Sequence, residues 1–375
     1  MLVLIASAPH DVHAMATRWA LSRMNVNCEI IFTGDLTTQA KLDYVNNDDG
    51  DSTWIWKDVK LGQTIDLHKA DVFWNRRVVA PIIPENVHEA DRLYVDRNFV
   101  VTWHAVEQFL SRNSIPVNHC IAKSEISAKS YQLDIARECG LAIPRTLISS
   151  DPDAVGKFFD ENKDTGTIMK SQVPMFWQVD GKFHSAYTTK LTKADVENSA
   201  AIDLCPMIFQ QCIEKTCEYR LVVFGASYWL FKIDSQSSSY TSTDWRVLDS
   251  GALNISLIET PEKLRASIRS FLEKSNLLMG IFDLAETPDG EFVFFEVNEQ
   301  GQFLFLEEAC KDSGLFDGFL HFVKNPSRDF VYTPNDEVIT YELFLENVDL
   351  EAMRKEELSR HAKYNKEWTV NEQIA

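Results

Sequence analysis

The chain has 375 residues, of which 45% are hydrophobic and 25% are charged. This length allows about two or three domains with cores of their own, and the composition excludes an intrinsically disordered chain. The formal net charge is −19 at pH 7. Because nucleic acids and anionic membranes are themselves negatively charged, we expect neither as the main partner.

The sequence contains no apolar run long enough to cross a membrane. Its first residues, MLVLIASAPHDVH, lack the basic start and the long apolar core of a secretory signal. Seven cysteines are scattered along the chain, with no CxxC pair and no cluster at zinc spacing. These features predict a cytoplasmic protein with reduced thiols.

The N-terminal part begins with an alternation of strand and helix. An apolar strand at 1–7, a helix at 12–24 and a strand at 27–35 predict a small open sheet. After these elements we expect a hairpin within 37–66 that carries Trp54 and Trp56, a strand at 71–77 that ends in Arg76 and Arg77, and a helix around 99–110.

The next part begins with a helix predicted at 127–139. Gly140 fits the position just after a helix end, and Pro144 begins a strand. The remaining expectations are strands and one helix as far as Leu191, a Ser/Thr-rich loop at 235–243 and, after Pro326, one acidic strand and one charged helix at 350–364.

The stretch FVFFEVNEQGQ begins at Phe292 and combines apolar residues with oxygen donors. If 292–298 form a strand, successive side chains alternate between its two faces. Phe294, Glu296 and Asn298 then share one face, whereas Phe295 lies on the other. One face therefore ends in a carboxylate and a carboxamide that point the same way.

A hairpin would bring a second carboxylate to Glu296. The two strands are joined at Asp289-Gly290, a dipeptide that favours tight two-residue turns, and such a turn places Asp283 directly opposite Glu296. Like charges on directly opposite positions of neighbouring strands destabilise a sheet. Mg²⁺ suits two carboxylates and an amide and takes its other ligands from phosphate and water. An exposed acidic pair on an edge hairpin, or a different register, remains the alternative.

Four stretches together resemble the ATP-grasp ligases and, among them, the microviridin-type graspetide macrocyclases. These stretches are FWNRR, KSYQLDIARECGLAIPRTLIS, KIDSQSSSYTSTDWR and FFEVNEQGQFLFLEE. The resemblance covers residues 1–325 and implies an α/β (α+β) ATP-grasp fold. Its implied parts are an N-terminal open-sheet pre-ATP-grasp domain at 1–120, a central lobe at 121–205, a C-terminal ATP-binding lobe with the metal site at 206–325, and an extension at 326–375.

The resemblance also implies roles for single residues. Lys129 and Lys170 match the two lysines that hold the phosphates of ATP, and Lys123 is the alternative to Lys129. An ammonium on a flexible stem suits this role because it neutralises phosphate without a fixed geometry. The implied ligands of Mg²⁺, or of Mn²⁺ in its place, are Asp283, Glu296 and Asn298.

The motif PMIFQQCIEK corresponds to the hinge between the two ATP-binding lobes of the family. Gln211, Cys212 and Ile213 would present side-chain and backbone groups to adenine, because a planar base needs a donor, an acceptor and apolar walls. Glu218 would bind the ribose.

Four arginines are candidates for the substrate end of the site. Arg220 and Arg246 would bind the acyl-phosphate, since a guanidinium binds carboxylate or phosphate through two donors. Ordinary ion pairs, with Asp244 in the case of Arg246, are the alternative. Arg76 and Arg77 either contact the substrate or cap the edge of the sheet.

The implied activity is a ligase reaction in which ATP phosphorylates an Asp or Glu side chain of a ribosomally made precursor peptide. A Ser, Thr or Lys side chain then displaces phosphate to form an ester or amide crosslink, with ADP and phosphate as products. The alternatives are a carboxylate-amine ligase acting on a small molecule or a protein, and a nucleotide-binding module without turnover. A homodimer is left open.

A chain with a net charge of −19 would repel an acidic peptide at long range. We therefore expect recognition through a separate leader segment, docked as a short helix on residues 173–191. Phe176, Trp177, Phe183 and Tyr187 are the candidate apolar anchors, and the alternative is that they pack a hairpin.

Overall fold

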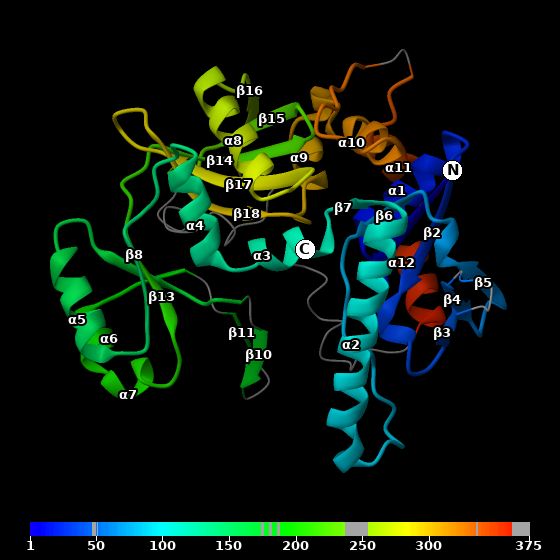
Figure 1. The fold of residues 1–375 in the computed structure, drawn as a ribbon. Helices are drawn as coiled ribbons and strands as arrows, with labels where there is room; N and C mark the ends of the chain where they lie inside the picture. The colour runs from blue at the N-terminus through cyan, green and yellow to red at the C-terminus, as the bar shows by residue number, and fades with distance from the viewer. Residues whose placement is uncertain are drawn as a thin grey trace.

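The computed structural model describes residues 1–46, 50, 52–173, 176–179, 182–185, 188–236, 254–334 and 337–361. The chain forms three parts, and the central lobe, in green, lies on the far side of the molecule from the blue N-terminal domain (Figure 1). The Ser/Thr-rich loop expected at 235–243 falls mostly outside the described residues.

The N-terminal domain is built on a parallel sheet with the strand order β2-β1-β6-β7. The strand-helix-strand start predicted from the sequence is confirmed, and Asp11 caps the first helix by accepting a hydrogen bond from the Ala14 N–H. The elements are β1 (Leu2–Ser7), α1 (Val12–Arg23), β2 (Asn27–Phe32), β6 (Val72–Asn75), α2 (Glu89–Asn113) and β7 (Ile115–Val117).

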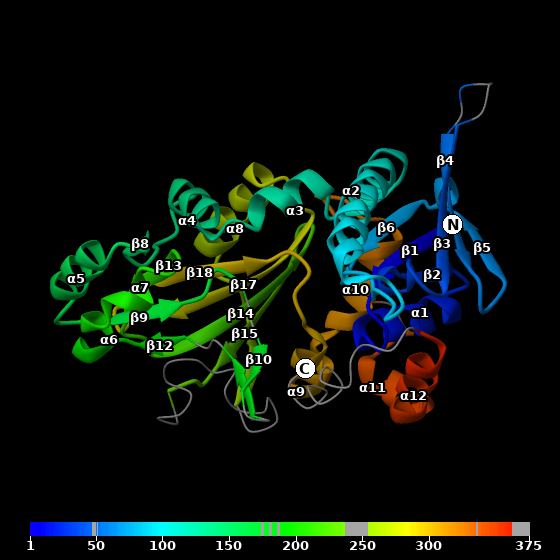
Figure 2. The same ribbon diagram turned by 90° about the horizontal axis from the view of Figure 1, so that it is seen from below.

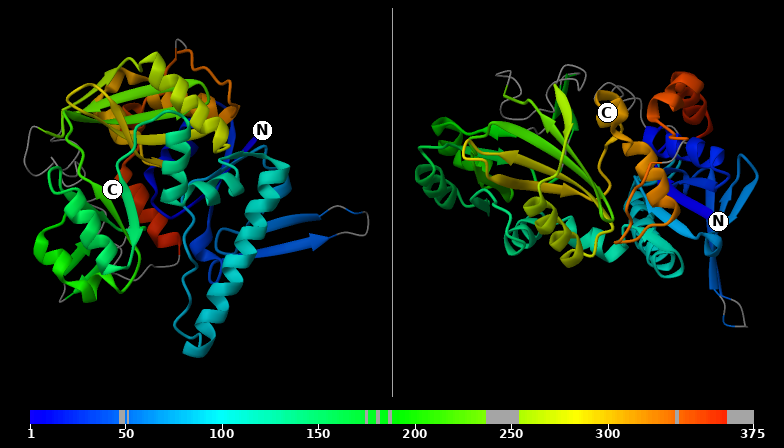
Figure 3. Two further views of the ribbon diagram at one scale, coloured as in Figure 1. Left: turned by 60° about the vertical axis from the view of Figure 1, so that its left-hand side comes forward. Right: turned by 90° about the horizontal axis from the view of Figure 1, so that it is seen from above.

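A second, antiparallel sheet covers part of the first one, and its long hairpin projects from the domain in Figure 3. The predicted hairpin is confirmed by the antiparallel pairing of residues 40–46 with 52–58. Trp56 on this hairpin is buried against Phe73 of the parallel sheet and against the last turns of α2. The three strands are β3 (Ala40–Asn46), β4 (Ser52–Asp58) and β5 (Gln63–Asp66).

The central lobe has a core of its own, formed around Val155, Phe158 and Phe209. Its sheet has the order β12-β9-β13-β8, so the strand that holds Phe209 belongs here although we expected the next lobe to begin at 206. Its elements are β8 (Thr146–Ser149), α5 (Pro152–Glu161), β9 (Thr167–Lys170), β10 (Phe176–Val179), β11 (Lys182–Ser185), β12 (Thr189–Lys190), α6 (Lys193–Glu197), α7 (Ser199–Ile202) and β13 (Met207–Gln211).

The C-terminal lobe is a five-stranded antiparallel sheet with the order β16-β15-β14-β17-β18. Helices on one face of this sheet bury Phe271, Phe282 and Phe294, and Figure 2 shows α4 and α8 on that side. The elements are α3 (Cys120–Ile126), α4 (Lys129–Glu138), β14 (Cys217–Phe224), β15 (Ser227–Ile233), β16 (Ile255–Ile258), α8 (Glu262–Lys274), β17 (Met279–Glu286) and β18 (Phe292–Asn298).

The opposite face of this sheet is only partly covered. Val222 and Phe224 at one end of β14 pack against α9 (Leu304–Ala309) and α10 (Leu315–Lys324), which also contact the N-terminal domain. Toward the other end of the strand, the same face carries the polar side chains of Glu218 and Arg220. This end of the face is therefore polar, and both residues are buried.

The C-terminal extension runs from the last lobe back to the N-terminal domain. Its helices are α11 (Tyr341–Asn347) and α12 (Leu350–Arg360), so the prediction of an acidic strand before the final helix is wrong. Thr340 caps α11, and Phe344 on that helix packs edge-on against Trp19 of α1. The apolar residues of this stretch therefore lie on a helix that packs against α1, and not on a strand of a sheet.

The extension ends on a buried cluster of charges. His361 lies 2.6 Å from Asp35 and 3.3 Å from Glu357, and its ring packs on Phe32. Glu357 also binds Arg18 at 3.2 Å. These contacts fasten the last described residue of the chain to the N-terminal sheet. None of the described helices has the length and apolar character needed to cross a membrane.

The first prediction concerns this cluster. Burial alone would lower the pKa of His361, but its hydrogen bonds and charge interactions with Asp35 and Glu357 outweigh burial and raise the pKa to about 9. Because this value lies above the unfolded one, the stabilisation is complete below pH ~6.5 and is lost as pH rises through about 9. His361→Gln should therefore lower the free energy of unfolding by about 2 to 3 kcal/mol at pH 7.

Urea unfolding at pH 7 and at pH 10 measures this effect. The difference between wild type and variant should shrink strongly at the higher pH, and the exposed His104→Gln on α2 serves as the control. A difference that is the same at both pH values would contradict a charged His361 in the folded state.

Candidate active site

Two carboxylates face each other on neighbouring strands, since the Cα partner of Asp283 on β17 is Glu296 on β18. This predicted pairing is confirmed, although the predicted turn is wrong. Thr287 pairs with Glu291 through a 3.0 Å backbone hydrogen bond, so the loop has three residues and not two. A β-bulge between the turn and Glu296 shifts the register by one residue in the opposite direction, and the two deviations cancel.

The bulge changes which side chains share a face. Leu284 pairs with Phe294 and Asp283 with Glu296, which leaves Phe295 as the extra residue. Phe294 is fully buried in the helix-covered core, so the expectation that it shares a face with Glu296 is wrong. The ring of Phe295 instead lies near the ammonium groups of the candidate site, 5.1 Å from the Nζ of Lys170.

Arg220 on β14 is the direct cross-strand neighbour of Asp283. Its Nη1 donates to Asp283 Oδ1 at 2.5 Å, and its Nη2 donates to the Gln302 carbonyl at 3.3 Å. Both side chains of this ion pair are largely buried. Removing one partner would leave an uncompensated buried charge, which is strongly destabilising.

Lys129 and Lys123 differ clearly in their surroundings. The Nζ of Lys129, the first residue of α4, forms an ion pair with Glu296. The Nζ of Lys123 lies 3.2 Å from Glu107 and so ties α3 to α2. Of the two lysines considered from the sequence, Lys129 is therefore the one that pairs with a carboxylate of the facing pair.

Lys215 is a site residue that the sequence reasoning did not single out, although it ends the hinge motif. Its Nζ donates to Glu218 at 2.8 Å and lies 5.9 Å from the centre of the Phe295 ring. Burial raises the pKa of Glu218, and the charge of Lys215 opposes that rise. Two lysines from different parts of the chain, Lys170 and Lys215, thus lie at one aromatic ring.

The hinge residues begin at the end of β13, since Gln211 is the last residue of that strand. The N–H of Gln211 donates to the Arg145 carbonyl and that of Cys212 to the Gly166 carbonyl, each at 2.9 Å. Both donors are therefore used by the fold, and Ile213 beyond them is half-buried. Arg246, with the rest of the TDWR stretch, lies outside the described residues.

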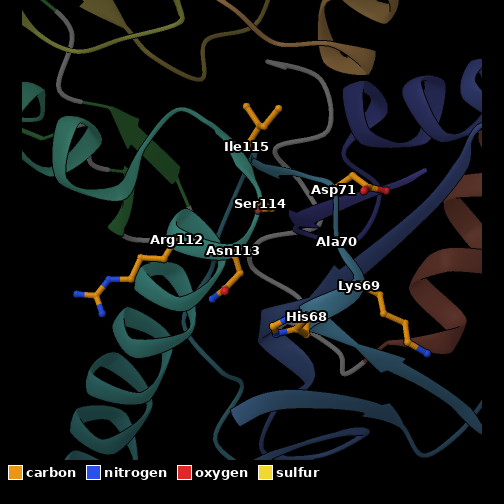
Figure 4. Close-up of a pocket in the computed structure, with 8 residues that line it drawn as sticks. All are labelled: His68, Lys69, Ala70, Asp71, Arg112, Asn113, Ser114 and Ile115. Carbon is orange, nitrogen blue, oxygen red and sulfur yellow. The ribbon is translucent and has the colours of Figure 1, made fainter. Parts of the chain in front are cut away.

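A separate cavity of about 530 Å³ lies away from these residues (Figure 4). His68, Lys69 and Arg112 line it, near the N-terminal ends of β6 and β7. Among the predicted site residues that the structure describes, none borders it.

No protein-family model matches the sequence, and no curated protein is similar to it. Solved structures match over most of the chain. The macrocyclase MdnC from Microcystis aeruginosa, bound with precursor peptide MdnA, is 22% identical, has a TM-score of 0.76 and covers 87% of this chain and 100% of its own. A RiPP-associated ATP-grasp ligase from Chryseobacterium gregarium, in complex with ADP and a leader and core peptide, is 21% identical, with a TM-score of 0.79 over 88% of this chain and 99% of its own.

This chain has the ATP-grasp fold. A third structure with that fold, the ligase PsnB complexed with a variant of its minimal precursor, Mg and ADP, is 19% identical, with a TM-score of 0.62 over 82% of this chain and 92% of its own. The fold expected from the sequence is therefore confirmed for most of the chain.

The residues at the polar end of this sheet face fit a magnesium ion. Asp283 and Glu296 face each other, and Asn298 pairs with Ile281 two residues farther along the same strands. Each carboxylate contacts a cation of the protein, Arg220 or Lys129. Within the described ranges no group of three His, Cys, Asp or Glu side chains is placed for a metal, so an ion here would also need amide, phosphate or water oxygen.

Gly301 lies against this group of residues and permits a second prediction. A Cβ at position 301 would lie 3.0 Å from the Asn298 side chain and 3.1 Å from Nη2 of Arg220. Gly301→Ala should therefore lower the free energy of unfolding by about 1 to 3 kcal/mol, because these well-packed groups have to move.

Chemical denaturation measures the change, and Gly156→Ala is the matched control. A Cβ at Gly156 in α5 would be 3.9 Å from its nearest neighbour, so that variant should be neutral or more stable by up to about 1 kcal/mol. Equal effects of the two substitutions would contradict close packing at Gly301.

Proposed function

We propose that this chain is an ATP-dependent ligase that crosslinks side chains of a ribosomally made precursor peptide. The observation that carries the proposal is the pair Asp283 and Glu296, which lies beside Lys129 in an ATP-grasp fold. The structures that match it over most of their length include a macrocyclase and ligases bound to precursor peptides. An acidic pair with nearby lysines is suited to hold a metal ion and phosphate.

ATP and Mg²⁺ are the proposed cosubstrate and cofactor. Mg²⁺ held by Asp283, Glu296 and Asn298, with Mn²⁺ as the alternative ion, would neutralise charge on the transferring phosphoryl group. Lys129 and Lys170 would bind the phosphates from two elements, since Lys129 begins α4 and Lys170 ends β9. Glu218 stays the proposed ribose ligand and Gln211, Cys212 and Ile213 the adenine contacts, with Arg220 and Arg246 at the acyl-phosphate end.

The reaction has two displacement steps. An oxygen of a substrate Asp or Glu side chain attacks the γ-phosphorus of ATP, and ADP leaves. A Ser or Thr hydroxyl, or a Lys amine, then attacks the acyl carbon, loses its proton, and phosphate leaves with the bonding electrons. No protein nucleophile is needed, so the chain contributes positioning and charge. Use of ATP also fits the cytoplasmic location expected from the sequence.

The peptide is proposed to dock through its leader on the central lobe, at residues 173–191. Strands β10 and β11 form a two-stranded hairpin there. The side chains of Phe176, Trp177 and Phe183, and the whole of Tyr187, lie outside the described residues, so their role as anchors stays a prediction. A ligase for small molecules is less well supported, because several of the matching structures are bound to peptides.

A homodimer also stays a prediction. The first half of α2 is the described surface that suits it, since Leu93, Tyr94, Val100 and Val101 are exposed on that helix.

The third prediction tests the metal site. The double variant Asp283→Asn with Glu296→Gln should bind ADP about tenfold or more weakly in the presence of Mg²⁺, because neutral amides do not offset the charge of the ion. Calorimetry with and without Mg²⁺ measures this. Asp134→Asn, which removes an exposed carboxylate of α4, is the control and should leave the affinity unchanged. Wild-type affinity in the double variant would exclude these two residues as ligands.

The fourth prediction concerns products. With its peptide, the enzyme should consume one ATP for each bond, release ADP and phosphate, and lower the peptide mass by one water per bond. Mass spectrometry and nucleotide chromatography detect both changes. AMP and pyrophosphate in place of ADP would indicate adenylation and overturn the acyl-phosphate route.

A leaderless peptide is the matched control for the substrate class. It should bind much more weakly than the full peptide, whereas replacing its ring-forming residues should change products more than affinity. Equal affinity for the leaderless and the full peptide would contradict docking through the leader.

A further inference from the structure

The ends of two parallel strands of the N-terminal domain lie next to the candidate active site. Strands β1 and β6 are neighbours, with Ala6 paired to Asn75, and the chain continues from β6 into Arg76 and Arg77. The N–H groups of both arginines donate to the Ala6 carbonyl at 3.0 Å. Open sheets with parallel strands bind ligands at this edge, outside the carboxyl ends of the strands.

Asp11 fixes the direction of both guanidinium groups. Its Oδ1 accepts from the Ala14 N–H at 3.0 Å and from Arg76 Nε at 3.3 Å, and its Oδ2 lies 3.4 Å from Arg77 Nε. Burial would raise the pKa of Asp11, but the charge of Arg76, supported by Arg77, lowers it to about 2. Asp11 is therefore ionised at neutral pH and holds each arginine by its Nε.

Arg76 connects this strand end to the loop that follows Asn298. Its Nη1 donates to the Gln300 carbonyl, and Trp74 Nε1 donates to the Gln300 side chain at 2.6 Å. Arg76 Nη2 is buried and has no hydrogen-bond partner among the described residues. The edge thus lies against the loop of the metal-site strand and has more donors than the fold uses.

Arg77 is the accessible member of the pair. Its side chain is 43% exposed, whereas that of Arg76 is 3% exposed. Within the described part of the chain, no hydrogen bond involves the two terminal nitrogens of Arg77. Both guanidinium groups interact with Asp11, and Arg76 also interacts with the charge of Glu299, so the terminal nitrogens of Arg77 are the exposed donors of this edge that can bind an anion.

We propose that Arg77 binds the side-chain carboxylate that the enzyme activates. The inference rests on the proposed ligase function and adds to it the group that recognises the acidic side chain. A guanidinium held at Nε presents its terminal nitrogens as two parallel donors, which match the two oxygens of a carboxylate. The exposed guanidinium of Arg77 also places a cation at this edge, which favours the entry of an acidic side chain into a protein with a net charge of −19.

Two capped amino acids serve as probes, N-acetyl-glutamate N-methylamide and its glutamine counterpart. Ligand-observed NMR measures their binding to the full chain, with and without Mg²⁺ and ADP. Wild type should bind the glutamate probe about tenfold more tightly than the glutamine probe, since only a carboxylate makes a charge-assisted paired contact. Arg77→Gln should remove this preference, and Arg77→Lys should keep part of it because the charge remains.

Arg137→Gln is the matched control, because that arginine is exposed on α4 and pairs with Asp134 away from this edge. No preference in wild type, or an undiminished preference in Arg77→Gln, would overturn the proposal. Thermal unfolding checks that the Arg77 variants are folded.

A nucleotide arm separates this site from a phosphate site. Arg77→Gln should leave the affinities for Mg²⁺ with ADP and with AMP-PNP unchanged. Loss of AMP-PNP affinity alone would assign Arg77 to the γ-phosphate and refute the carboxylate role. If wild type binds no nucleotide, the ligase proposal fails, whereas the preference between probes without nucleotide still decides the role of Arg77.

Discussion

The repulsion between Asp283 and Glu296 is the constraint on which the candidate site depends. Two like charges on directly opposite positions of a sheet are unfavourable, and the fold keeps them by placing a cation beside each one. Arg220 comes from the neighbouring strand, and Lys129 comes from the start of a helix packed on the same lobe. The site is therefore assembled from the β17–β18 hairpin, β14 and α4. Each carboxylate of the hairpin is paired with a cation from one of the other two elements.

The N-terminal domain contacts this assembly at the loop that follows Asn298. Gln300 receives hydrogen bonds from Trp74 and Arg76, while Gly301 and Gln302 contact Arg220. The loop 300–302 is thus bound on one side by the strand ends of the N-terminal domain and on the other by Arg220 of the C-terminal lobe. The C-terminal extension makes a second connection between these parts, since its path from α10 to His361 ends on the N-terminal sheet.

The sequence predicted the elements that follow a simple period, such as the first strand and helix, and it predicted the partner of Asp283. It predicted neither the three-residue loop nor the bulge that offsets it, because Asp289-Gly290 is compatible with loops of two and of three residues. The helix at 341–347 was missed because an apolar period in a short acidic stretch fits strand and helix alike. Lys215 was missed since a lysine before a strand acquires meaning only when Phe295 and Glu218 lie beside it.

The bulge inserts Phe295 into β18 between Phe294 and Glu296. A regular ladder that passed straight from Phe294 to Glu296 would keep Phe294 in the core and would still set Glu296 opposite Asp283. The extra residue is therefore not required for the pairing of the carboxylates. What it adds is an aromatic surface close to two ammonium groups, one from the central lobe and one from the hinge. In this strand, one inserted residue contributes a binding surface without disturbing the acidic pair beside it.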